Sequence, residues 1–418
     1  MIDNRRPFKR FLNNNPYELF KNLETPSYVI DEAMLIENGK ILKEIQDKTG
    51  AKILLAQKAF SNFNLYNLLR KYISGVASSG LYEARLGYEE MNGAEVHTFS
   101  CAYREDEILD IIKYSDHIVF NSINQLKKFG PLCKKYGKSI GIRINPEKST
   151  QKGPSIYDPC SKVSRLGIPL STLDKELDLD TLNLIDGIHF HTLCQQNSDD
   201  LKITLDEVDK KFNKYLKNLK WINFGGGHHI TRSDYNIDLL IECINFVKNK
   251  YNVEVYLEPG EGVVLDAGYL LTKVLDTYKY NDNQFVIVDT SSACHMPDVI
   301  EMPYLPPLYK TDLSDCNNLV YLGCPTCLSG DLIGKYKFNK IPNVNDLLIF
   351  GDMALYTMVK NNTFNGMKLP NIFILKEDNS LIKSPDRHVG QPRYTKLLQS
   401  DKSVLYSGGR YGISMTSG

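Results

Sequence analysis

The sequence lacks several features that mark whole classes of protein. No stretch approaches the roughly 18 apolar residues that cross a membrane, and 50 Lys and Arg residues balance 50 Asp and Glu residues. The first 15 residues are polar and basic, without the apolar stretch of a signal peptide. We therefore expect no membrane and no nucleic acid as partner. A transit peptide stays open as an alternative, because these residues also lack Glu.

The nine cysteines show no metal-binding pattern. Cys324 and Cys327 form the one close pair, and no second CxxC or HxxxH stands at the spacing of a zinc site. A thioredoxin-like redox site needs a strand-to-helix turn, whereas this pair is followed by Leu-Ser-Gly-Asp. We expect no metal, and reduced thiols in the cytoplasm.

What the sequence does contain is a series of short apolar runs, rich in β-branched residues, between amphipathic helical stretches. Eight such runs are the number of strands in a (β/α)8 TIM barrel. A doubly wound open sheet is the alternative, but it needs a Gly-rich turn after the first strand, where Lys58-Ala-Phe-Ser stands. The expected strands are Ala51–Gln57, Ser74–Ser78, Val96–Ser100, His117–Asn121, Ser139–Asn145, Gly187–His191, Trp221–Gly225 and Glu254–Glu258.

After Glu258 the pattern changes to strands joined by Pro-, Gly- and Asn-rich turns, which predicts a C-terminal, mostly β domain. The predicted organisation is an N-terminal extension over 1–25, a barrel over 26–265 and the β domain over 266–418. Residues 27–31 form an early strand that is a candidate member of the β domain. The expected later strands are Tyr269–Tyr280, Gln284–Asp289, Leu319–Gly323, Asp346–Phe350 and Asn371–Leu375.

Chemically useful side chains stand where the predicted barrel strands end. Lys58, Arg143, His191 and Glu258 end four strands, and Gly225–Gly227 follows the seventh. Barrel enzymes build their active sites at these carboxyl ends. We therefore expect the five features to meet in one site.

Each feature has a chemical interpretation and a plainer one. Lys58 follows an apolar run, which favours the neutral amine that forms an imine, although a lysine at a loop start is often merely exposed. Gly225–Gly227 matches the phosphate site of barrels, or is only a flexible turn. Glu258 can pair with the protonated pyridine nitrogen of a cofactor, or it caps a turn.

His191 and Cys327 carry weaker signals. A histidine at the sixth strand end can lie flat on a cofactor ring, although a lone histidine is more often a core residue. A thiol in the Cys324–Asp331 loop can deliver a proton to a carbanion, although an ordinary cysteine explains it equally. Together the set indicates pyridoxal 5′-phosphate (PLP) held on Lys58.

At this point the sequence resembles a known family, the fold-type III PLP-dependent decarboxylases, over about residues 25–415. The resemblance implies an α/β fold whose TIM barrel is of the alanine racemase-like kind. More narrowly it resembles the carboxynorspermidine/carboxyspermidine decarboxylases. Gly187–Cys194 and His295–Val299 are the specific motifs, and the others are shared more widely. The segments that carry the resemblance are Lys52–Phe60, Val76–Ala84, Gly187–Cys194, Asn223–His228, Glu258–Gly262, His295–Val299 and Gly323–Asp331.

The resemblance implies a role for each site residue. Lys58, Cys327 and His191 are the catalytic group, Cys327 reprotonating the α-carbon and His191 stacking on the ring. Glu261 and Asp298 are expected, with Cys327, at the substrate. Members are homodimers with shared active sites, the Cys loop entering the partner's barrel. The cofactor set comprises Lys58, Arg143, His191, Gly225, Gly226, Gly227, Glu258 and Tyr356.

Two departures narrow the expected substrate. Ornithine-type members carry Arg where Glu261 stands and Asp where Leu328 stands. Diaminopimelate decarboxylases need an Arg-rich pocket for a second carboxylate, and the sequence does not point to one. Acidic groups suit a polyamine, so the expected reaction is decarboxylation of carboxynorspermidine or carboxyspermidine to norspermidine or spermidine. The two substrates differ by one methylene group, and the sequence does not indicate which of them is preferred. The alternatives are a diaminopimelate, ornithine or arginine decarboxylase, an alanine-racemase-like enzyme, a small PLP carrier or a non-catalytic regulatory homologue.

Overall fold

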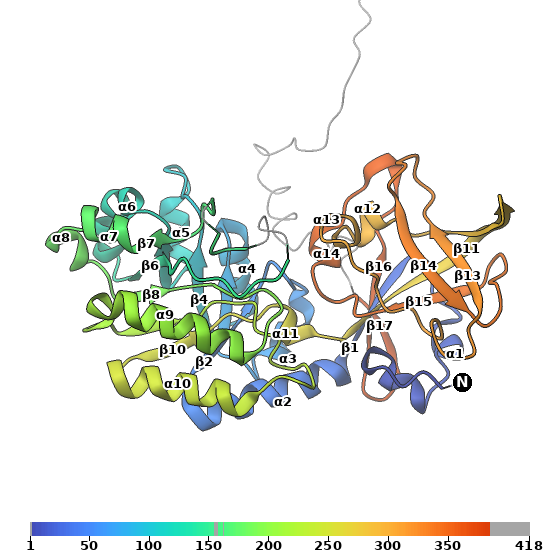
Figure 1. The fold of residues 1–418 in the computed structure, drawn as a ribbon, viewed down its shortest axis with the longest axis horizontal. Helices are drawn as coiled ribbons and strands as arrows, with labels where there is room; N and C mark the ends of the chain where they lie inside the picture. Colours follow the sequence, from blue (N-terminus) through green and yellow to red (C-terminus); the bar gives the residue numbers. More distant parts are fainter. Residues whose placement is uncertain (1, 154–157, 162, 385–418) are drawn as a thin grey trace, which may run out of the picture.

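A computed structural model describes residues 2–153, 158–161 and 163–384, and its chain folds into a barrel and a separate mixed sheet (Figure 1). Eight parallel strands pair in a ring, which closes where β5 pairs with β6. The predicted TIM barrel and all eight predicted strands are confirmed. The barrel strands are β2 (Lys52–Ala56), β3 (Gly75–Ser78), β4 (Glu95–Phe99), β5 (His117–Phe120), β6 (Ser139–Asn145), β8 (Gly187–His189), β9 (Trp221–Asn223) and β10 (Glu254–Leu257).

Helices cover the outside of the barrel (Figure 1). The first, α2 (Glu32–Thr49), begins where the Asp31 carboxylate accepts from the backbone of Ala33 and Met34, and ends at left-handed Gly50. The pairing of β6 extends to a short strand, β7 (Ile168–Pro169). The remaining helical segments of the barrel are η2 (Phe63–Leu65), α3 (Tyr66–Leu69), α4 (Leu81–Glu90), α5 (Ile108–Tyr114), α6 (Ile123–Lys135), α7 (Leu170–Glu176), α8 (Leu179–Leu182), α9 (Ser198–Leu216) and α10 (Ile237–Tyr251).

Aromatic and charged side chains fill the end of the barrel at which the strands begin. The rings of His97 and His117 stack with centroids 3.9 Å apart, beside Trp221 and Tyr256. Lys52 Nζ lies 2.5 Å from the nearest carboxylate oxygen of Glu95, which also approaches His97. This packing leaves the opposite end of the barrel for a site.

The second domain is a mixed sheet in the order β14-β13-β12-β11-β1-β16-β17, with β15 paired to β11. The predicted mostly β domain is confirmed. Two of its strands, β14 and β17, were not predicted. The strands are β1 (Ser27–Asp31), β11 (Gly268–Tyr280), β12 (Asn283–Val288), β13 (Asn318–Gly323), β14 (Leu332–Phe338), β15 (Leu347–Gly351), β16 (Asn371–Leu375) and β17 (Leu381–Lys383).

The early strand β1 lies in the second sheet, antiparallel to β11 and parallel to β16. The chain passes from β1 into α2 of the barrel, and returns through α11 (Glu261–Val264) into β11 (Figure 1). The domain bounds themselves stay a prediction. Short helical segments complete the second domain: α12 (Ser292–His295), α13 (Asp298–Glu301), α14 (Thr357–Lys360) and η4 (Phe364–Gly366).

The N-terminal residues pack on the second domain. They form η1 (Arg6–Leu12) and α1 (Pro16–Phe20), and Phe8, Phe11 and Phe20 are buried against strands of the mixed sheet. Within the described residues, no helix is both long enough and apolar enough to cross a membrane.

Candidate active site

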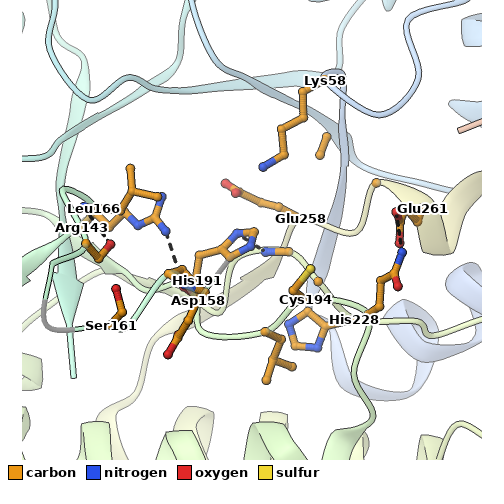
Figure 2. Close-up of a pocket in the computed structure, with 18 of the residues that line it drawn as sticks. Lys58, Arg143, Asp158, Ser161, Leu166, His191, Cys194, His228, Glu258 and Glu261 are labelled. Carbon is orange, nitrogen blue, oxygen red and sulfur yellow. Dashed lines mark hydrogen bonds between the residues drawn. The ribbon is translucent and has the colours of Figure 1, made fainter. Parts of the chain in front are cut away.

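A cavity of about 400 Å³ opens at the carboxyl ends of the barrel strands. Lys58 comes two residues after β2, Arg143 lies near the end of β6, His191 follows β8 and Glu258 follows β10. These four side chains face one another across the cavity (Figure 2). Tyr356 reaches the same cavity from the second domain, where its backbone N–H donates to the carbonyl oxygen of Ala59 at 2.8 Å.

Lys58 extends its amine into the cavity (Figure 2). Its side chain is exposed to the cavity, and its amine makes no hydrogen bond or ion pair with any residue that the structure describes. Desolvation by the surrounding protein lowers the pKa of Lys58, the charge of Arg143 lowers it further, and Glu258 opposes both. The net effect shifts Lys58 toward the neutral amine, which is the form that reacts with a carbonyl group.

Glu258 is an ionised carboxylate at the base of the cavity. Asn223 Nδ2 donates to its Oε1 at 2.8 Å, and His189 Nε2 lies 3.3 Å from its Oε2. Burial raises the pKa of Glu258, but His189, His97 and Asn223 together outweigh burial and hold the pKa below its ordinary value. Burial lowers the pKa of His189, so the neutral imidazole is favoured.

The turn Gly225–Gly227, which follows β9, has room only for glycine. Gly225 and Gly227 have left-handed backbones, with φ of +70° and +84°. A Cβ on Gly227 would lie 2.0 Å from the carbonyl oxygen of Leu193, and one on Gly226 would lie 2.6 Å from that of Glu258. No other residue type fits these positions without movement of the backbone.

The three N–H groups of the predicted phosphate site, Gly225–Gly227, differ in what they contact. The Gly225 N–H donates to Asn223 Oδ1 at 2.8 Å, and the Gly226 N–H donates to His191 Nδ1 at 3.1 Å. Among the described residues only the Gly227 N–H of the three has no partner. Because His191 Nδ1 accepts, its proton is on Nε2, and burial with the nearby charges of Lys58 and Arg143 lowers the pKa of His191 far below its ordinary value.

Arg143 and Glu261 bring opposite charges to two sides of the cavity. Burial lowers the pKa of Arg143 to about 10, which leaves it cationic at neutral pH, and its guanidinium lies 4.8 Å from the ring centroid of Phe99. Glu261 begins α11, where His229 Nε2 lies 2.6 Å from one carboxylate oxygen and Gln195 Nε2 3.1 Å from the other.

Three predicted site residues do not line the cavity of their own chain: Gly225, Cys327 and Asp298. Cys327 is exposed in the Cys324–Asp331 loop of the second domain. Asp298 begins α13, and its carboxylate pairs with Lys360. The structure thus brings together Lys58, Arg143, His191, Gly226, Gly227, Glu258, Glu261 and Tyr356, with Gly225 buried directly behind, and leaves Cys327 and Asp298 outside.

Sequence reasoning missed the residues that support Glu258 and Glu261. His189 and Asn223 hold Glu258, while His229 and Gln195 hold Glu261. The first pair had a readable signal, because residues two apart on a strand share a face. His189 is two residues before His191, and Asn223 is two before Gly225.

Comparison with known proteins places this fold and cavity in a family. A profile described as "Pyridoxal-dependent decarboxylase, C-terminal sheet domain" matches residues 27–354. The chain belongs to the pyridoxal-dependent decarboxylases.

The chain is also similar to individual decarboxylases over most of its length. It is 41% identical over 375 residues to carboxynorspermidine/carboxyspermidine decarboxylase of Campylobacter jejuni subsp. jejuni, covering 87% of this chain and 96% of that protein. It is 36% identical over 357 residues to carboxyaminopropylagmatine decarboxylase of Synechocystis sp., covering 85% and 91%. The predicted resemblance to the carboxynorspermidine/carboxyspermidine decarboxylases is confirmed.

Solved structures agree. The carboxynorspermidine decarboxylase of Campylobacter jejuni, complexed with norspermidine, matches with a TM-score of 0.80 and 39% identity, over 87% of this chain and 98% of that one. A diaminopimelate decarboxylase matches with a TM-score of 0.75 but only 18% identity, over 88% and 92%, which is a likeness of fold.

Proposed function

We propose that this protein holds PLP on Lys58 and decarboxylates carboxynorspermidine or carboxyspermidine, giving norspermidine or spermidine. One observation carries the proposal: the unpartnered amine of Lys58 faces the ionised Glu258 across a cavity edged by the glycine turn. The bound cofactor would supply an electron sink for the pair of electrons that the departing carboxylate leaves behind. All other steps fall to side chains of the protein.

The cavity residues fit the cofactor. Lys58 would hold it covalently, and the anionic Glu258 would keep a pyridine nitrogen protonated. His191 would cover one ring face as a neutral imidazole, whose orientation the Gly226 N–H fixes. The Gly227 N–H and Tyr356 would hold the phosphate, since both line the cavity and the Gly227 N–H has no partner among the described residues. The buried cation Arg143 would balance the negative charge that the cofactor adds.

Glu261 supports a cationic substrate. It lines the cavity at the end away from Arg143, so an α-carboxylate and a distal amine would find opposite charges. His229 and Gln195 fix the orientation of the carboxylate at the cavity wall, where an amine of the substrate would meet it. Asp298 would act outside the cavity, at the place where its carboxylate pairs with Lys360. Leu328 after Cys327 disfavours ornithine.

Cys327 would donate the proton that replaces CO2 at the α-carbon. Because it does not line the cavity of its own chain, this role needs a partner subunit whose Cys324–Asp331 loop enters the barrel. We therefore propose a homodimer with shared sites. All nine cysteines are free, which supports work in the reducing cytoplasm.

The deciding experiment measures CO2 release from six substrates by the purified holoenzyme: carboxynorspermidine, carboxyspermidine, carboxyaminopropylagmatine, ornithine, arginine and diaminopimelate. We expect the first two to be turned over at least about 100-fold faster, by kcat/KM, than the three amino acids. Preference for an amino acid would refute the substrate assignment. Preference for carboxyaminopropylagmatine would move the protein to the activity of its 36% identical relative.

A further inference from the structure

The N-terminal strap, residues 2–23, lies outside the segment that the family profile matches, 27–354. It is nevertheless firmly packed. Phe8, Phe11 and Phe20 are 0%, 6% and 1% exposed, and the ring of Phe11 lies 4.8 Å from that of Tyr269 on β11. Burial of three aromatic side chains fixes the strap on the mixed sheet. Its polar residues are therefore held in place where they reach the barrel.

Arg6 of the strap bridges two segments that lead to the cavity. Its Nη1 lies 2.8 Å from Asp266 Oδ2, and its Nη2 donates to Asn38 Oδ1 at 2.6 Å. A guanidinium suits such a bridge because its donors are held in one plane.

The first arm of the bridge leads to Glu261. Asn38 is fully buried on α2 of the barrel, and its Nδ2 donates to the carbonyl oxygens of Val263 at 3.2 Å and Leu265 at 2.9 Å. These carbonyls belong to the end of α11, whose first residue is Glu261. Arg6 thus orients Asn38, and Asn38 holds the helix that carries the cavity carboxylate.

The second arm leads to Tyr356. The backbone N–H of Asp266 donates to Asp352 Oδ1 at 2.7 Å, and the N–H of Met353 donates to the carbonyl oxygen of Gly268 at 2.9 Å. Asp352 precedes Tyr356 by four residues. The turn at Asp266 therefore holds the segment that delivers Tyr356 to the cavity.

The contact between the Asp266 turn and the Asp352 segment depends on the positive charge of Arg6. Burial raises the pKa of both Asp266 and Asp352, and the Asp266 charge raises that of Asp352 further, to about 8. Arg6 opposes both increases, with His229 also facing Asp266. Without Arg6, the carboxylate of Asp266 would lose its ion-pair partner while still largely buried, which favours movement of the turn at Asp266 away from the Asp352 segment.

We propose that Arg6 is a positioning residue that sets the substrate end of the cavity by holding the α11 segment and the Tyr356 segment together. The proposal rests on the proposed function, because its effect is on the groups assigned to substrate and phosphate. Through Arg6 the strap acts on the cavity, in addition to covering the mixed sheet.

The test compares Arg6→Met with Arg5→Met. Arg5 is a matched control in the same strap, which contacts Asp3 and the carbonyl oxygen of Leu308 and none of the cavity residues. We expect Arg6→Met to raise KM for carboxynorspermidine about tenfold, with kcat within about threefold of the parent, since it loosens binding groups and not the reacting atoms. Arg5→Met should leave KM unchanged. Arg6→Lys should recover part of the loss, because an ammonium keeps the Asp266 pair but not the geometry of both arms.

Hydrogen exchange supplies a measurement that does not depend on turnover. Peptides over 261–268 and 352–357 should exchange at least about tenfold faster in Arg6→Met than in Arg5→Met. Equal KM values and equal exchange in the two variants would refute the proposal, as would an Arg6→Met effect confined to thermal stability. If the parent enzyme releases no CO2 from a carboxylated polyamine, the proposed function fails, and exchange still decides whether Arg6 holds the segments. If Arg6→Met does not fold, Arg6→Lys takes its place in both measurements.

Discussion

His189 Nε2 lies 3.3 Å from Glu258 Oε2, deep in the barrel, and reaches the carboxylate from β8, which β9 separates from β10. Burial raises the pKa of Glu258, whereas His189 lowers it more than any other neighbour does. Because the folded-state pKa of Glu258 is below its ordinary value, its contribution to stability is present above that ordinary value and is lost as the pH falls through the folded pKa.

We predict that His189→Leu moves the acid limb of the kcat/KM profile to higher pH, by about one unit or more. Without His189, burial raises the pKa of Glu258, so the carboxylate takes up a proton at a pH where the parent is still ionised. A pH–rate series from pH 5 to 9 measures the shift. His228→Leu is the control, since this buried imidazole pairs with Tyr235 instead. An equal shift in both variants would contradict the role given to His189.

Lys58→Ala should lower kcat by about 1,000-fold or more, because the amine that exchanges with the substrate is gone. The parent holoenzyme should absorb visible light, and borohydride should fix the cofactor to the peptide that contains Lys58. Mass spectrometry of the digested protein locates the added mass. Attachment at any other lysine would overturn the assignment, and Lys52, which pairs with Glu95 at the far end of the barrel, is an internal reference.

The fold was largely predictable because each barrel strand is a short apolar run, bounded by a helix on both sides in sequence. The strand β14 escaped prediction because its buried residues, Ile333, Tyr336 and Phe338, break the alternation of a regular strand. The cavity residues were predictable as strand ends, since all carboxyl ends of a parallel barrel meet. Arg6 was not, because its contact with Asp266 spans 260 residues and leaves no local pattern.

Gly227→Ala should destabilise the protein by about 2–4 kcal/mol and weaken cofactor retention, because a left-handed backbone and a clash with Leu193 act together. Gly137→Ala is the matched control. Gly137 also has a left-handed backbone, with φ of +70°, but its added Cβ would meet nothing within 4 Å. We expect it to cost about 1 kcal/mol and to leave the cofactor bound.

Thermal unfolding and absorbance after dialysis measure the two effects separately. Loss of the cofactor from Gly137→Ala at the same rate as from Gly227→Ala would show that backbone strain alone, and not the place of the turn beside the cavity, is responsible. Full retention in Gly227→Ala would remove the glycine turn from the phosphate site.

Cys327→Ala should slow turnover by about 10²–10⁴-fold, the usual contribution of a positioned proton donor, while the cofactor stays bound. Cys324→Ala is the neighbouring control. Cys324 is held by the Ser292 N–H, and burial raises its pKa, so it is a poor proton donor and its loss should affect stability more than rate. If Cys327→Ala instead expels the cofactor, the residue has a structural role.

Mixing the Lys58→Ala and Cys327→Ala proteins tests whether the site is shared. Each homodimer is nearly inactive, but a mixed dimer would hold one site with both an intact Lys58 and an intact Cys327. Random exchange of subunits makes half of the dimers mixed, each with one of two sites restored, so about a quarter of the parent activity should return. Recovery should depend on subunit exchange and not appear on simple dilution. No recovery, with exchange verified by native mass spectrometry, would place the thiol of each chain at its own cavity and would require the Cys324–Asp331 loop to move toward it.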